Sequence, residues 1–262
     1  METDTDSALL MSFVQMKANG SNKLKLLSYC LTLIIIINIL CQITPIGAED
    51  DIAKDADIFR KKENSSMKIA LTFDDGPHPV QTPQILDLLD KYGIKATFFT
   101  VGVNATYYSD TLDLISRRGH EIGNHTFSHP QVSSLDPETL KSEVEKCEST
   151  IYGLTDRKTK LFRPPEGMID SDVKKVLGKL DYKVILWDID TRDWAHTPPK
   201  KIAQNVIDNI CSGDIILMHD YISYNSPTLE ALELFVPVLL EQGYSFVVVS
   251  ELIGINEKDP KT

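Results

Sequence analysis

The chain has 262 residues, of which 42% are hydrophobic and 25% are charged, and its formal net charge is -11. This length suits one large domain or a domain with extensions, and the composition is that of a folded protein. The excess of acidic groups argues against nucleic acid as a partner, because phosphate binding needs a basic face.

The first 48 residues differ from the rest of the chain. An apolar run at 26–41 follows three lysines and precedes Gly47 and Ala48. A basic flank, an apolar centre and small residues at the end are typical of a secretory signal, and the apolar run also leaves a signal anchor open. We expect residues 1–48 to engage the membrane or the secretion machinery, and the protein to be secreted or held at the cell surface or wall.

Cysteine and asparagine positions add expectations about this compartment. Cys147 and Cys211 lie beyond the apolar run, and they form either one disulfide or two buried free thiols. Asn64 and Asn104 begin Asn-x-Ser/Thr acceptors, so a secreted chain is expected to be a glycoprotein. Asn124 begins a third acceptor, but its place between candidate site residues predicts that it is buried.

Strand-like and helical segments alternate after a charged stretch at 49–66, which we predict to be a linker before a domain at 67–262. Thr82 and Asp136 are expected to cap helices. The predicted strands are 68–73, 96–101, 120–124, 160–163, 183–188, 214–219 and 245–249. The predicted helices are 82–91, 105–118, 137–152, 171–180, 200–210 and 228–241.

About seven strand–helix units without internal repeats predict an α/β fold with a parallel sheet covered by helices. This density of units favours a (β/α) barrel, whose site lies at the carboxyl ends of its strands. An open doubly wound sheet is the alternative, but the first strand lacks the GxGxxG phosphate signature.

Polar residues stand where the predicted strands end. His125 and His129 are four residues apart, and on a helical turn both rings would face one metal ion. Two histidines and one carboxylate are a common catalytic ligand set for zinc. The other polar residues at strand ends are Asp74, Asp75, Arg163, Asp190, Asp193 and His219.

Five short motifs occur in order along the chain. They are TFDDG at 72–76, HTFSH at 125–129, RPPEG at 163–167, DTRDW at 190–194 and LMH at 217–219. Over about 67–253 the chain therefore resembles the polysaccharide deacetylases of the NodB-homology type (carbohydrate esterase family 4), which include chitin deacetylases and peptidoglycan N-acetylglucosamine deacetylases.

This resemblance implies a distorted (β/α) barrel of the NodB type and a hydrolase that uses metal-activated water. Its substrate would be an N-acetylglucosamine-containing polysaccharide, with chitin or a chitooligosaccharide favoured, and its N-acetyl groups would be removed. Two alternatives stay open, namely an O-acetyl ester deacetylase acting on other glycans and a catalytically silent glycan-binding wall protein. A monomer is favoured.

The resemblance also implies roles for individual residues. Asp75, His125 and His129 would bind one divalent ion, zinc in the first place and cobalt as the alternative. Asp74 would be the general base and His219 the general acid.

Further residues would support this pair of catalytic groups. Arg163 would hold Asp74, and Asp193, rather than Asp190, would orient His219. The backbone N–H of Glu166 would stabilise the oxyanion, although the family often has an aromatic side chain there. Apolar walls would come from Trp194 and Leu217.

Overall fold

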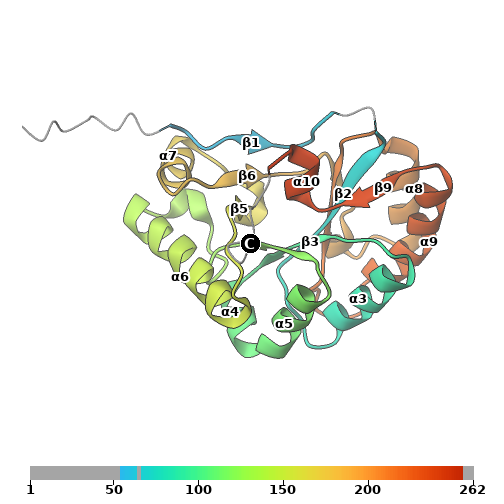
Figure 1. The fold of residues 1–262 in the computed structure, drawn as a ribbon, viewed down its shortest axis with the longest axis horizontal. Coiled ribbons are helices and arrows are strands. Elements are labelled where there is room, and N and C mark those ends of the chain that lie inside the picture. The colour runs from blue at the N-terminus through green and yellow to red at the C-terminus, as the bar shows by residue number, and fades with distance from the viewer. Residues whose placement is uncertain (1–53, 64–65, 256–262) are drawn as a thin grey trace, which may run out of the picture. The chain divides into compact units, whose positions relative to one another are not determined.

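The computed structural model describes residues 54–63 and 66–255 (Figure 1). The predictions for residues 1–48 and for Asn64 lie outside these ranges. Among the described residues, no helix combines the length and the apolar character that a membrane crossing requires.

Within the described ranges, nine strands form one sheet in the order β1-β6-β5-β4-β3-β2-β8-β7, and β9 pairs with the start of β2. Every strand pair is parallel. The strands are β1 (Ile58–Phe59), β2 (Lys68–Asp74), β3 (Thr97–Thr100), β4 (Glu121–Asn124), β5 (Leu161–Phe162), β6 (Lys183–Ile185), β7 (Ile189–Asp190), β8 (Ile215–His219) and β9 (Ser245–Val247).

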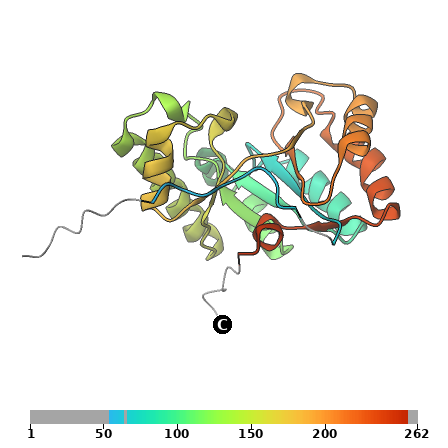
Figure 2. The same ribbon diagram turned by 90° about the horizontal axis from the view of Figure 1, so that it is seen from above.

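Helices cover the outside of this curled sheet, as Figure 1 shows for α3 to α6. Figure 2 shows α6 and α7 on one side of the sheet and α8 and α9 on the other. The α-helices are α3 (Gln81–Lys91), α4 (Gly102–Tyr107), α5 (Ser109–Arg117), α6 (Pro137–Thr155), α7 (Ser171–Lys179), α8 (Pro199–Asn209), α9 (Thr228–Glu241) and α10 (Val249–Ile253). Short 3-10 turns are η1 (Val132–Ser134), η2 (Pro165–Gly167) and η3 (Asp193–Ala195).

The sheet is a distorted (β/α) barrel that stays open, because β1 and β7 end the strand order without pairing with each other. Its central strands are buried on both faces, which is why β2 reads as an apolar run rather than an alternation. Phe73 and Phe98 stack in the core with ring centroids 5.0 Å apart. The predicted fold class is therefore confirmed.

Some local predictions differ from the structure. Two residues of the predicted linker at 49–66 form β1, which pairs with β6 and is supported by an ion pair between Lys183 and Asp57 at 2.8 Å. Charged residues flank this strand, so the sequence pattern does not indicate it. An edge strand can form with only a few apolar residues. The single helix expected at 105–118 is divided at Tyr108, whose backbone leaves the helical region.

The two predicted caps have different outcomes. Asp136 caps α6, and its carboxylate accepts hydrogen bonds from the backbone N–H groups of Glu138 and Thr139. Thr82 does not cap α3, because that helix begins one residue earlier. The Thr82 hydroxyl instead donates to the buried carboxylate of Asp220 at 2.6 Å.

Candidate metal and catalytic site

Strand register gathers the polar strand ends at one edge of the sheet. The last residues of β2 and β8, Asp74 and His219, are register partners. Asn124 at the end of β4 pairs with Phe162 of β5, so His125 and Arg163 leave the sheet beside each other. Residues far apart in the sequence thus meet at the carboxyl ends of parallel strands, as the barrel fold requires.

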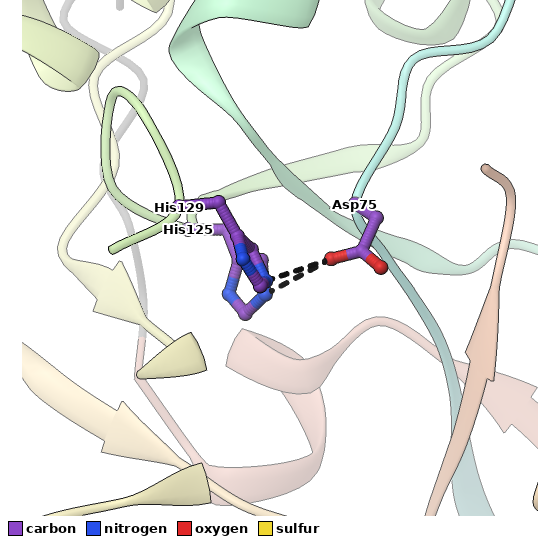
Figure 3. A group of neighbouring side chains, drawn as sticks. All are labelled: Asp75, His125 and His129. Atoms are coloured by element: carbon purple, nitrogen blue, oxygen red, sulfur yellow. Dashed lines mark ion pairs between the residues drawn. The ribbon is translucent and has the colours of Figure 1, made fainter. Parts of the chain in front are cut away.

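Asp75, His125 and His129 form a group whose candidate ligand atoms all lie within 4.8 Å of one another (Figure 3). The Asp75 Oδ1 atom is 3.4 Å from His125 Nε2 and 3.1 Å from His129 Nε2. Burial raises the pKa of Asp75, but hydrogen bonds with the two histidines outweigh this effect and hold the pKa below its ordinary value.

The two histidines do not lie on a helical turn, so that prediction is wrong. They begin and end a tight loop in which Thr126 and His129 have φ values of 67° and 59°. The Glu143 carboxylate of α6 accepts the backbone N–H groups of Phe127 and Ser128 at 3.0 and 2.8 Å. These hydrogen bonds hold the loop, from which both imidazoles point towards Asp75 (Figure 3).

The geometry of this group fits a divalent metal ion. His125 Nδ1 lies 2.7 Å from the backbone oxygen of Arg163, which can only accept, so Nδ1 carries a proton and Nε2, which faces Asp75, is the atom that would bind an ion. Ligands about 2.0–2.2 Å from a tetrahedral ion are roughly 3.3–3.6 Å apart, close to the separations found here. Two nitrogen ligands and one oxygen ligand suit zinc, cobalt or nickel.

Asp74 is buried and makes an ion pair with Arg163. The Arg163 Nη1 atom is 2.7 Å from Asp74 Oδ1 and also donates to the Thr72 hydroxyl at 2.7 Å. The remaining guanidinium nitrogens donate to the backbone oxygens of Ile185 and Leu186. Arg163 is completely buried, so its position is fixed, and the second oxygen of Asp74 remains available at the cavity.

Asp193, rather than Asp190, contacts His219. The Asp193 Oδ1 atom is 2.8 Å from His219 Nδ1, and Oδ2 accepts the backbone N–H of His219 at 2.8 Å. Asp190 instead accepts the backbone N–H of Arg192 at 2.8 Å. Burial lowers the pKa of His219, but the hydrogen bond and charge of Asp193, with the nearby carboxylates, raise it to about 9.

These groups surround a cavity of about 470 Å³, called here the central cavity. Glu166 lies at its rim on an exposed turn with φ 59°. Trp194 is 51% exposed, whereas Leu217 is buried, and both form walls of the cavity. The residues lining it are Asp74, Asp75, His125, His129, Glu166, Trp187, Asp190, Trp194, Leu217 and His219.

Sequence reasoning missed Trp187 and Asp220. Trp187 follows β6 and lines the central cavity, so its place at a strand end was a usable signal. Asp220 is buried, and its backbone N–H donates to Asp74 O at 3.2 Å. A Cβ atom at Gly76 would collide with its carboxylate, which explains the glycine after the two acids.

The cysteine and asparagine predictions are partly resolved. Cys147 and Cys211 are both free, the first buried and the second exposed, so they form no disulfide with each other and only one of these two thiols is buried. Asn124 is buried as predicted. The Asn104 side chain donates to the backbone oxygen of Asp75 at 2.7 Å, and its glycosylation stays a prediction.

The pattern of the family described as Polysaccharide deacetylase matches residues 61–185. The chain is 40% identical over 192 residues to a peptidoglycan-N-acetylglucosamine deacetylase of Bacillus cereus, covering 72% of this chain and 90% of that relative. It is 31% identical over 204 residues to a chitooligosaccharide deacetylase of Bradyrhizobium sp., covering 72% of this chain and 92% of that relative.

A similar solved structure is a family 4 acetyl xylan esterase from Clostridium thermocellum, in complex with a cobalt ion. Its TM-score is 0.68 at 33% identity, over 73% of this chain and 94% of that one. The family model and the identity to these relatives agree. This chain belongs to the polysaccharide deacetylase family.

Proposed function

We propose that the protein is a metal-dependent hydrolase that removes N-acetyl groups from an N-acetylglucosamine-containing polysaccharide. One observation carries the proposal: the metal-ligand group at Asp75 shares a single cavity with Asp74, a candidate base, and with His219, a candidate acid. A divalent ion held by Asp75, His125 and His129 would polarise the acetyl carbonyl and acidify the attacking water.

Asp74 would accept the proton of the attacking water. Its Oδ1 atom is bound by Arg163 at 2.7 Å, and its Oδ2 atom lies 3.9 Å from His125 Nε2, next to the ligand group. The guanidinium holds the carboxylate in place beside the ligand group, and a general base must be positioned in this way. The ion pair is buried, so solvent does not weaken it.

His219 would donate a proton to the leaving amine. Its pKa of about 9 keeps the imidazole protonated at neutral pH, and Asp193 holds Nδ1 so that Nε2 is the group left to act. The backbone N–H of Glu166 would stabilise the negative charge on the carbonyl oxygen. Leu217 would pack against the acetyl methyl group, and Trp194 against the sugar.

Chitin or a chitooligosaccharide remains the proposed substrate class, and the Bacillus cereus relative supports peptidoglycan glycan strands as the alternative. The protein is incubated with zinc or cobalt and either N-acetylated chitopentaose or peptidoglycan, and released acetate is measured. Asp74→Asn is the matched inactive control. Failure to release acetate from any acetylated glycan would contradict the proposal.

An ester deacetylase acting on acetylated xylan is the second candidate, and the likeness to the acetyl xylan esterase supports it. Parallel assays on acetylated xylan and chitopentaose separate the two, because each reports a rate for one type of bond. If wild type and Asp74→Asn are equally inactive while both bind glycan, the protein is a silent binder.

We also propose that residues 1–48 direct the chain out of the cytoplasm as a signal peptide or anchor. The basic, apolar and small-residue pattern supports this. Fractionation of cells that express the full chain, followed by N-terminal sequencing, tests it. A protein found in the cytoplasmic fraction with an intact N-terminus would refute it.

A further inference from the structure

A second cavity, of about 710 Å³, lies next to the loops that build the central cavity. One wall is the loop after η3, which carries His196 and Thr197, and the other is the loop after β8, which carries Tyr224 and Ser226. The elements just before these two loops, η3 and β8, supply Trp194 and His219 to the central cavity. The second cavity, called here the distal cavity, therefore opens at the same edge of the sheet.

The side chains of the distal cavity suit a sugar ring. Thr197, Asn225 and Ser226 offer hydroxyl and amide groups that both donate and accept, as sugar hydroxyls do. Tyr224 is 88% exposed and offers an aromatic surface for the apolar face of a pyranose. Such an exposed aromatic ring beside a polar cavity is typical of a binding surface rather than of a core.

The charged side chains of the distal cavity restrict the charge of the ligand that it can bind. Among the described residues that line it there is no lysine or arginine, and Glu230 contributes a carboxylate. An acidic ligand would be repelled there, whereas a neutral N-acetylated sugar or a sugar with a free amine would not. The exposed acid at the rim is compatible with both the substrate and the product of deacetylation.

The loop that carries Tyr224 is held in an unusual backbone conformation. Tyr224 and Asn225 have φ values of 58° and 35°, in the left-handed region that non-glycine residues seldom adopt. Such conformations persist only when neighbouring contacts hold them, and they are frequent at binding sites. The strain is consistent with a loop that is shaped in advance for a ligand.

A chain of hydrogen bonds joins the distal cavity to the proposed general acid. Ser226 Oγ donates to Thr228 Oγ1 at 3.1 Å, and Thr228 Oγ1 donates to Asp193 Oδ2 at 2.8 Å. The other oxygen of Asp193 contacts His219 Nδ1. A ligand on Ser226 is thus three hydrogen bonds from the acid, within a network whose members polarise one another.

We propose that the distal cavity is a glycan subsite that binds a hexosamine pyranose of the same polymer whose acetyl group is in the central cavity. This inference rests on the proposed function and adds a chain-length requirement to it. Tyr224 stacks on the sugar, while Asn225 and Ser226 bind its hydroxyl groups. Oligosaccharides long enough to fill both cavities are then better substrates than short ones.

The test compares N-acetylated chitobiose with chitohexaose as substrates of the full chain. For Tyr224→Ala we expect kcat/KM on chitohexaose to fall about tenfold, mainly through KM, and the ratio of chitohexaose to chitobiose rates to fall with it. Tyr224→Trp keeps an aromatic face and should restore the ratio. The control is Tyr152→Ala on α6, an exposed tyrosine at 45%, which should keep the wild-type ratio. An equal effect of Tyr224→Ala on both substrates, or none, would overturn the subsite.

Measuring the binding of chitohexaose tests the subsite independently of the proposed reaction. Calorimetry of chitohexaose with Asp74→Asn, with and without Tyr224→Ala, measures the subsite without turnover. If no variant releases acetate but Tyr224→Ala still weakens binding about tenfold, the proposed reaction is wrong and the subsite stands. If acetate is released but the substitution leaves the Kd unchanged, the subsite alone is wrong. Absence of chitohexaose binding to every variant overturns the subsite.

Discussion

Replacing Asp193 by asparagine is a sharp test of the proposed acid pair. The carboxylate accepts four hydrogen bonds, from His219 Nδ1, His219 N, Trp194 N and Thr228 Oγ1. Asparagine has the same shape but one acceptor oxygen, so its amide nitrogen faces donors whichever way it turns. A buried N–H loses its partner and the buried imidazolium loses its counter-charge. We expect Asp193→Asn to lower the free energy of unfolding by about 3–5 kcal/mol at neutral pH.

The pH dependence of this loss identifies its cause. The pKa of His219 is raised from 6.5 to about 9 in the folded protein, so its stabilisation is complete below pH 6.5 and is lost as the pH rises through 9. At about 1.4 kcal/mol per pH unit, this interval corresponds to about 3 kcal/mol. The stability difference between wild type and Asp193→Asn should therefore shrink by about that amount between pH 6 and 9.5.

The measurement is urea unfolding of the metal-free protein at both pH values. Other titrating groups are common to both proteins and cancel in the difference. Asp190→Asn is the matched control, since Asp190 lies at the same cavity but bonds Arg192 N rather than His219. It should keep the wild-type pH dependence. A stability difference for Asp193→Asn that is the same at pH 6 and 9.5 would refute the reasoning.

Three further outcomes are expected. Asp74→Asn should abolish turnover and keep the metal, whereas Asp75→Asn should lower the affinity for the metal by about 10-fold or more. Metal titration of the metal-free proteins measures this affinity. Loss of the metal in Asp74→Asn would reverse the assignment of the two acids. Arg163→Met leaves Asp74 buried without its partner and should cost about 3–5 kcal/mol in urea unfolding, so a loss below about 1 kcal/mol would show that the pair is not needed. A thiol reagent should modify the exposed Cys211 quickly and Cys147 only on unfolding, because burial raises the pKa of Cys147 to about 12. Peptide mass spectrometry measures the labelling of each cysteine. A disulfide-linked pair of these two peptides would contradict the free thiols.

Residues whose signal is local were predictable. The apolar run that ends in Asp74 and Asp75 shows where β2 stops, and the alternation of strands and helices predicts that such ends share one edge. The metal-ligand residues follow from this rule and from the motifs. Asp136 is another local case, because a cap depends only on the residues that follow it.

The order of residues shows which chemical groups stand at the strand ends, whereas the folded chain shows which of these groups make contact. Spacing along the chain does not distinguish Asp190 from Asp193, and only the resemblance to the family favours Asp193. The register of β7 and β8, together with the turn η3 that follows β7, brings Asp193 to His219. Thr82 has the local pattern of a helix cap, but in the folded protein its hydroxyl donates a hydrogen bond to Asp220, which lies 138 residues later in the chain. Pairings of this kind depend on distances across the sheet and on burial, and the order of residues along the chain does not reveal either of these.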